Sequence, residues 1–214
     1  KIVYTGYLER ESARGAPNAE HSIPFDRPYL LVTPGGGGDG DAMVDWVLRA
    51  YESDATPPYP ALLVFGPFMQ QEKQLEFARR VGELKNVEAI TFEANIEPLI
   101  QGASGIVAMG GYNTFCEILT FDKPALIIPR TVPRKEQFIR AYRAQELGLV
   151  RMLEDDGIRN DRDMATALRH LPQQHRPSDI IVPGLLDGLP NVNRLARRLS
   201  GRNSRPLAAI AGQN

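Results

Sequence analysis

Residues 105–128, GIVAMGGYNTFCEILTFDKPALII, contain the pattern that decides the fold. An apolar run at 105–109 leads into two glycines, and apolar residues at helical spacing then cover 114–121. A second apolar run, 125–128, comes directly after Pro124. A strand, a glycine turn, a helix and another strand in this order predict a βαβ unit with two parallel strands.

The same alternation of strands and helices extends along the chain in both directions. Each expected strand is apolar on both faces, which is typical of a parallel sheet covered by helices on its two sides. We therefore predict an α/β fold, a doubly wound, Rossmann-like parallel sheet of about six strands, with ligands beyond the carboxyl ends of the strands. The other expected strands are 29–33, 61–65, 87–92 and 150–153, and the other expected helices are 41–52, 70–84, 96–101, 136–147 (ended by Gly148), 161–171 (N-cap Asp161) and 191–199 (N-cap Asn191).

The composition excludes several classes of protein. Among the 214 residues, 25 basic and 26 acidic side chains give a net charge of −1, which excludes a strong global attraction to nucleic acid. The single cysteine, Cys116, excludes an internal disulfide and a multi-cysteine zinc site, and we expect it in the core. Three scattered histidines argue against a histidine cluster, so no metal site is expected. No apolar stretch approaches the roughly 18 residues of a membrane span.

The ends of the chain differ in character from its middle. We expect residues 1–28 to form an N-terminal strand (Ile2–Thr5) and a linker, residues 29–200 to form the main domain, and residues 201–214 to form a flexible tail. The chain starts at Lys1 without an initiator methionine, so we expect a processed or excised piece of a longer protein.

The first candidate site is the glycine loop after strand 29–33. Residues 35–40 formally match the G-x-G-x-x-G pattern, which lets backbone amides approach a dinucleotide. The acids Asp39, Asp41 and Asp45 would repel phosphates there, and Phe65 is followed by no acid that could hold a ribose. A P-loop is excluded, since Asp41 stands where a lysine is required. A phosphate-lining loop and a flexible turn both remain open.

The second candidate site is the turn after strand 105–109. Gly110 and Gly111 lead into a helix, with Asn113 or Thr114 as the expected N-cap. Amide groups and the positive dipole end at a helix start favour phosphate. Glu117 lies one turn into this helix, where it could accept hydrogen bonds from a ribose diol or merely complement the helix dipole.

The third candidate site is the loop after strand 125–128. Arg134 or Lys135 could neutralise phosphate, and Gln137 could bind sugar hydroxyls. A solvated basic loop at a helix start is the alternative interpretation.

Taken together, the three loops resemble the C-terminal donor-binding domain of GT-B glycosyltransferases, in particular the family that contains the peptidoglycan GlcNAc transferase. The resemblance rests on the motif from Gly110 to Glu117, on 123–129 and on Glu136-Gln137, and it extends from about Pro28 to Leu199. It implies that the glycines and the helix start hold a diphosphate, that Glu117 binds the ribose, and that Gln137 lies near the sugar. With Arg134 from the loop itself, the expected substrate-binding residues are Gly35, Gly36, Gly37, Phe92 (near the base), Gly110, Gly111, Tyr112, Asn113, Thr114, Glu117, Arg134, Glu136 and Gln137.

The resemblance also implies what this chain lacks. It covers one half of a GT-B enzyme, and the catalytic base is expected on an N-terminal, acceptor-binding domain or subunit. The nucleotide-diphosphate sugar is a substrate, so no cofactor is expected. We expect a cytoplasmic location, with peripheral contact to the inner membrane left open. The alternatives are a nicotinamide-dependent oxidoreductase domain, half of a sugar-nucleotide 2-epimerase, or a non-catalytic subunit of a split glycosyltransferase.

Overall fold

The computed structural model describes residues 2–10, 24–36 and 38–200. The described residues form two compact units, one made of 2–9 with 182–200 and the other of 10–181 with its gaps. The domain boundaries expected at residues 28 and 200 stay a prediction, because much of 1–28 and all of 201–214 lie outside the described residues.

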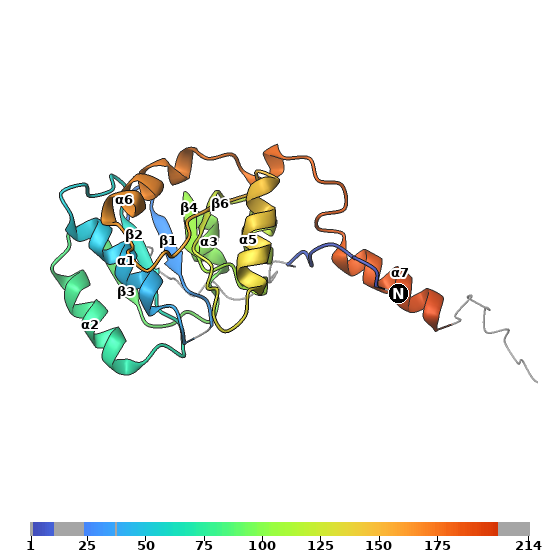
Figure 1. Ribbon diagram of the computed structural model, residues 1–214, viewed down its shortest axis with the longest axis horizontal. Coiled ribbons are helices and arrows are strands. Elements are labelled where there is room, and N and C mark those ends of the chain that lie inside the picture. The colour runs from blue at the N-terminus through green and yellow to red at the C-terminus, as the bar shows by residue number, and fades with distance from the viewer. Residues whose placement is uncertain (1, 11–23, 37, 201–214) are drawn as a thin grey trace, which may run out of the picture. The chain divides into compact units, whose positions relative to one another are not determined.

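A parallel sheet forms the centre of the larger unit. Its strands are β1 (Leu30–Thr33), β2 (Ala61–Val64), β3 (Val87–Ile90), β4 (Gly105–Ala108), β5 (Ala125–Ile127) and β6 (Arg151–Met152). Within the described residues these six strands form one sheet in the order β3-β2-β1-β4-β5-β6, with every pair parallel (Figure 1). The order reverses between β1 and β4, and ligands bind at such a point in doubly wound folds. The predicted α/β fold is confirmed.

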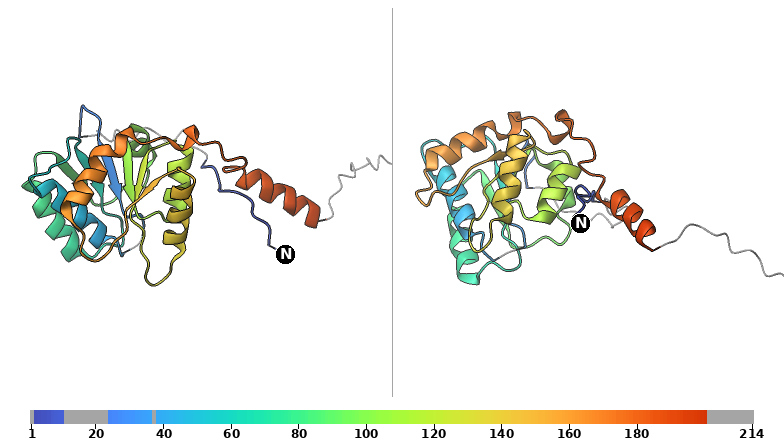
Figure 2. Two further views of the ribbon diagram at one scale, coloured as in Figure 1. Left: turned by 45° about the horizontal axis from the view of Figure 1, so that its top comes forward. Right: turned by 45° about the vertical axis from the view of Figure 1, so that its right-hand side comes forward.

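Helices cover both faces of this sheet. The helices of the larger unit are α1 (Asp41–Glu52), α2 (Gln71–Gly82), α3 (Glu97–Gly102), α4 (Tyr112–Thr120), α5 (Glu136–Glu146) and α6 (Asp161–His170), followed by the short 3-10 helices η1 (Leu171–Gln173) and η2 (Pro177–Asp179). Helices α1, α2 and α6 pack on one face, and α3, α4 and α5 lie on the other (Figure 2). Right-handed crossover connections produce this division. Among the described helices, none is long and apolar enough to span a bilayer.

Burial follows the sequence pattern. All residues of β1, β2, β4 and β5 are buried, as expected for strands covered on two sides. Trp46 of α1 is also buried, and its indole Nε1 donates to the Asn160 carbonyl at 2.8 Å, which ties the start of α6 to α1. Cys116 is buried in α4, so the prediction that it belongs to the core is confirmed. Gly148 follows α5 with φ +80°, so its predicted role in ending that helix is confirmed as well.

Two predicted helix starts in the C-terminal part of the chain are wrong. Helix α6 is capped by Asn160, whose side-chain Oδ1 accepts from the Arg162 N–H at 2.9 Å, and Asp161 is the first helical residue. The helix of the smaller unit, α7 (Gly188–Leu199), begins before Asn191, which lies within it. For α6 the capping side chain is one residue before the predicted one, whereas α7 has Asp187 as its N-cap, four residues before Asn191 and without a side-chain capping bond.

The N-terminal segment belongs to the smaller unit but forms no strand within its described part. The Tyr7 N–H donates to the Leu185 carbonyl at 2.7 Å, and the Gly188 N–H donates to the Tyr7 carbonyl at 3.0 Å. The predicted strand Ile2–Thr5 is wrong. Tyr4 there is 93% exposed, because these residues have no neighbouring strand to pair with in the described part of the chain.

Candidate functional site

The loops after β1, β2 and β4 converge at the carboxyl edge of the sheet. Gly35 follows β1 with φ +86°, and a Cβ placed on it would lie 3.5 Å from Thr114 Oγ1 of α4. Gly66 follows β2 with φ +91°, and a Cβ there would lie 2.6 Å from the Gly35 carbonyl oxygen. Gly36 faces open space, and Gly37 lies outside the described residues. The glycines therefore let three loops meet closely at the switch point of the sheet.

The Gly110–Gly111 turn is fixed by its surroundings. Gly110 has φ +75°, and a Cβ on it would lie 2.8 Å from Ile127 Cγ2 of β5. Gly111 has φ −54° and is the N-cap of α4, and the first intrahelical bond runs from the Phe115 N–H to the Gly111 carbonyl at 2.9 Å. The backbone thus starts the helix at this turn without a side-chain cap.

Helix α4 begins at Tyr112, so the prediction that Asn113 or Thr114 would cap it is wrong. The glycine supplies the turn conformation itself, which leaves both polar side chains inside the first turn. Tyr112 is 41% exposed, Asn113 is exposed and Thr114 is partly buried. The amide groups of this turn and the positive end of the helix dipole together form a region suited to an anion.

Arg140 of α5 supports this turn, and the sequence did not indicate it. Its Nη1 donates to the Gly110 carbonyl at 2.7 Å, and its guanidinium carbon lies 5.7 Å from the centre of the Tyr112 ring. The side chain therefore holds the turn by a charge-assisted hydrogen bond and a cation–π contact. It also adds a positive charge beside the start of α4.

Glu117 lies on α4, and its side chain is only 15% exposed. Arg10 Nη2 donates to Glu117 Oε1 at 3.2 Å, and the Arg10 N–H donates to Thr120 Oγ1 at 3.1 Å. Burial raises the pKa of Glu117 above its ordinary value, while the charge and hydrogen bond of Arg10 act in the opposite direction. The carboxylate is thus held in place by a residue 107 positions earlier in the chain, which local spacing does not indicate.

The loop after β5 brings another charged group to the same edge. Arg130 pairs with Asp39 of the glycine loop, and its Nη2 lies 3.2 Å from Glu136 Oε1. Gln137 is 8% exposed, and its Oε1 accepts from the Arg130 N–H at 3.3 Å. Arg134, the cation favoured by the sequence along with Lys135, is exposed to solvent. The structure therefore brings Arg130 rather than Arg134 into contact with the glycine loop.

Phe92 is set apart from the other predicted residues. It follows β3, which is two strands away from β1 in the sheet, and 55% of its surface is exposed. Its expected contact with a nucleotide base stays a prediction.

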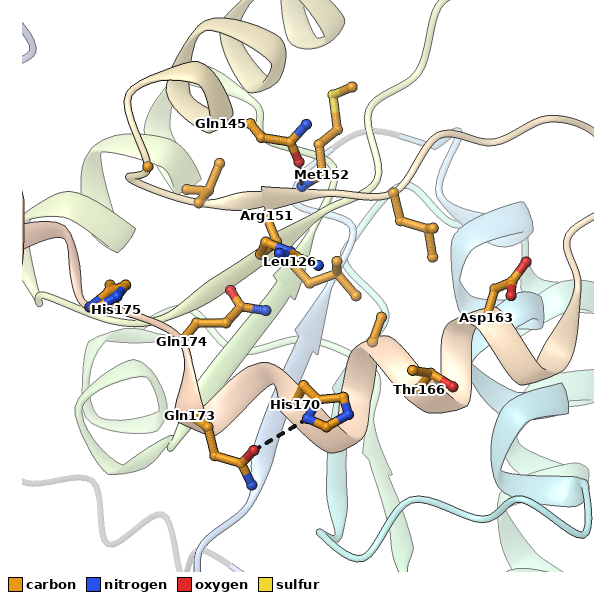
Figure 3. A pocket seen from close by; sticks show the side chains of 14 residues that line it. Leu126, Gln145, Arg151, Met152, Asp163, Thr166, His170, Gln173, Gln174 and His175 are labelled. Atoms are coloured by element: carbon orange, nitrogen blue, oxygen red, sulfur yellow. Dashed lines mark hydrogen bonds between the residues drawn. The ribbon is translucent and has the colours of Figure 1, made fainter.

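A cavity of about 1000 Å³ lies away from these loops, between β6, α6 and the end of α5 (Figure 3). Side chains from Gln145, Asp163 and His170 line it, and His170 Nδ1 lies 3.3 Å from Gln173 Oε1. None of the predicted site residues borders this cavity. In the part of the chain that the structure describes, no group of three His, Cys, Asp or Glu side chains is arranged to hold a metal ion.

The comparisons with known proteins give one family match and several glycosyltransferase relatives. Residues 30–175 match the model of the glycosyltransferase family 28 C-terminal domain. An uncharacterized glycosyltransferase of Methanosarcina acetivorans is 30% identical over 153 residues, which cover 72% of this chain and 37% of that protein. The UDP-N-acetylglucosamine–N-acetylmuramyl-(pentapeptide) pyrophosphoryl-undecaprenol N-acetylglucosamine transferase of Alkaliphilus metalliredigens is 20% identical over 166 residues, which cover 76% of this chain and 45% of that protein.

A solved structure supports the same fold. The calicheamicin glycosyltransferase CalG4 has a TM-score of 0.60 and 21% identity, over 84% of this chain and 43% of that one. This chain thus spans less than half the length of each of these three relatives. The family match extends from β1 to just past η1, so it includes all three candidate loops. The chain belongs to the glycosyltransferase family 28 C-terminal domain family.

Proposed function

We propose that this chain is the donor-binding half of a glycosyltransferase and that it binds a nucleotide-diphosphate sugar where the loops after β1, β4 and β5 meet. The observation that carries the proposal is the Gly110–Gly111 turn, which starts α4 at the switch point of the sheet with Arg140 beside it. Amides and a cation at this place would bind the diphosphate and stabilise it as the leaving group.

The other groups take roles that follow from their positions. Glu117 would accept hydrogen bonds from the ribose hydroxyls. Arg10 already holds its carboxylate in a fixed orientation for this role. Glu136 and Gln137 lie at the start of α5, beside Arg130, where they would bind the sugar. The nucleotide sugar is the substrate of this reaction, so the proposal includes no cofactor.

The proposal includes a second domain or subunit. The catalytic base and the acceptor site would lie on an N-terminal partner, so this chain alone is not expected to transfer a sugar. In the smaller unit, the side chains of Ile2 and Leu199 are 83% and 88% exposed and offer apolar surface to such a partner.

We place the protein in the cytoplasm. Arg194, Arg197 and Arg198 of α7 could there contact the headgroups of an anionic membrane surface.

Calorimetric titration of the chain with UDP, GDP, ADP and dTDP tests the proposal. One of these diphosphates should bind with a Kd below about 1 mM, which corresponds to about −4 kcal/mol. NADH serves as the comparison, because an oxidoreductase would bind it in preference. Absence of binding to all four diphosphates would reject the proposed function.

We expect the nucleotide affinity to fall as the pH is lowered. The fall should begin at a higher pH than it would for a glutamate with an ordinary pKa. Burial raises the pKa of Glu117 above 4.5, with Glu97 adding to the shift and Arg10 opposing it. Protonation removes acceptor capacity for the ribose hydroxyls. Titrations from about pH 4.5 to 7.5 should show this loss in the wild type. The diphosphate titrates near pH 6 as well, so Glu117→Gln, which removes only the carboxylate, is the control.

The same pKa shift makes the free energy of unfolding depend on pH in the direction opposite to the nucleotide affinity. Because the pKa of Glu117 is raised in the folded chain, its neutral form stabilises the fold; this contribution is complete below the ordinary pKa of 4.5 and is lost as the pH rises through the raised pKa. Loss of affinity at low pH therefore cannot come from unfolding caused by this group. An equal pH dependence in the wild type and in Glu117→Gln would contradict the ribose role.

A further inference from the structure

Arg130 is held between two acids at the edge of the candidate site. Its Nη1 pairs with the carboxylate of Asp39, and its Nη2 lies 3.2 Å from Glu136 Oε1. The side chain is 29% exposed, so the guanidinium is neither in the core nor freely solvated. Two carboxylates around one guanidinium leave this cluster with a net charge of −1.

The position of the Arg130–Asp39 pair follows from the order of the strands. Asp39 belongs to the loop after β1, and Arg130 comes shortly after β5. Strand β4 lies between these two strands in the sheet, and it leads directly into the Gly110–Gly111 turn. The ion pair thus joins the two loops that flank the proposed diphosphate site. A diphosphate bound at the start of α4 would therefore lie between the two loops that carry these charges.

One donor of Arg130 is still unsatisfied. Its Nε is buried, and it has no hydrogen-bond partner among the described residues. A buried donor without an acceptor costs about 1–3 kcal/mol, so a rearrangement of the guanidinium that gives Nε an acceptor would be favourable. Phosphate offers several oxygens, and a guanidinium binds it with two parallel hydrogen bonds. Asp39 is bound at Nη1 and Glu136 at Nη2, so a phosphate can accept two hydrogen bonds from this guanidinium only if one of the two carboxylates leaves.

We propose that Arg130 is the cation that binds the donor diphosphate, and that Asp39 is its counter-ion while the site is empty. The inference rests on the proposed function and names a residue for it that neither the sequence pattern nor the family resemblance assigned. When a nucleotide diphosphate binds, the guanidinium exchanges the Asp39 carboxylate for phosphate oxygens, while Glu136 keeps the side chain oriented. Asp39 therefore competes with the ligand, and it also repels the ligand's negative charge.

The two partners of the ion pair should then have opposite effects on affinity. Arg130→Gln should weaken binding of the diphosphate by about tenfold, a difference of about 1.4 kcal/mol. Asp39→Asn should strengthen it by about threefold, since the competitor and its charge are both removed. If Arg130 only supported the loop, removal of the Asp39 charge would not make the diphosphate bind more tightly. Arg143→Gln, which removes an exposed cation farther along α5, is the matched control and should change affinity less than twofold.

The experiment uses the whole chain with UDP, GDP, ADP and dTDP in calorimetry, and the corresponding nucleosides in saturation-transfer NMR. Both substitutions should leave nucleoside binding unchanged, because the nucleoside carries no phosphate. Circular dichroism checks that each variant is folded, and Arg130→Lys retains the charge if Arg130→Gln is unstable; it should bind more weakly than the wild type, because lysine lacks the planar fork.

The outcomes separate this inference from the proposed function. Suppose that the wild type binds a diphosphate, but Asp39→Asn binds it no more tightly or Arg130→Gln binds it equally well. The proposed exchange of Asp39 for phosphate at Arg130 is then wrong, while the proposed donor-binding function is kept. An equal loss for nucleoside and diphosphate would also overturn the role of Arg130. If the wild type binds none of the four diphosphates, the proposed function and this inference fail together.

Discussion

Replacing Gly110 with alanine should lower the free energy of unfolding by about 2–4 kcal/mol and abolish measurable nucleotide binding. The residue has φ +75°, where an L side chain is strained by about 1–2 kcal/mol. The new Cβ would also lie 2.8 Å from Ile127 Cγ2, and Ile127 is fully buried in β5 and cannot move away easily. Relief of this contact would shift the turn that begins α4 and break the bond from Arg140 to the Gly110 carbonyl.

Gly111→Ala is the matched control for this substitution. At Gly111 the backbone has φ −54°, and a Cβ would meet no atom within 4 Å. Alanine is a poorer N-cap than glycine, but it also reduces the entropy of the unfolded chain, and these two small effects oppose each other. Its stability should therefore stay within about 0.5 kcal/mol of the wild type.

Thermal unfolding and nucleotide titration measure both effects. For a chain of this size, the loss at Gly110 corresponds to a melting temperature lower by roughly 5–15 °C. If Gly110→Ala and Gly111→Ala melt at the same temperature, the strained turn and its contact with Ile127 are not what fixes the start of α4.

The sequence was sufficient to predict the sheet, because burial on both faces leaves a direct signal. Strands 29–33, 61–65, 105–109 and 125–128 are continuous apolar runs, and each forms a strand within one residue of its expected end. The edge of the sheet was harder. The run 87–92 was expected to be a strand throughout, but β3 ends at Ile90, and Phe92 beyond it is 55% exposed. An edge strand has only one neighbour, so its pattern defines its end less sharply.

The candidate site was predicted in its loops but not in its contacts. Glycines after strands are visible in the sequence, and the structure does bring Gly35 next to Thr114. By contrast, Arg10, Arg130 and Arg140 act on residues that are 107, 91 and 30 positions away in the chain. Local spacing carries no information about such pairs. In the loop after β5 it favoured Arg134 or Lys135 as the cation, whereas the structure brings Arg130 to the glycine loop.

Loss of the Glu117 carboxylate should weaken binding of the nucleotide by about 1–3 kcal/mol, the range for hydrogen bonds to a charged group. The carboxylate is 15% exposed and is oriented by Arg10, so it can receive a ribose diol without a large loss of side-chain entropy. Glu117→Ala removes this acceptor. The alternative, in which Glu117 only complements the helix dipole, predicts a loss of stability without a change in selectivity for the sugar of the nucleotide.

A comparison of UDP, GDP or ADP with the corresponding 2′-deoxynucleotide separates these two interpretations. The wild type should prefer the ribonucleotide, and Glu117→Ala should bind both forms equally, because the group that distinguishes them is gone. Glu97→Ala removes a nearby acid whose charge acts on Glu117, and it should keep the preference for ribose. If Glu117→Ala instead weakens both forms by the same factor, the carboxylate supports the helix rather than the ribose, and the diphosphate contacts at the start of α4 must account for nucleotide binding without it.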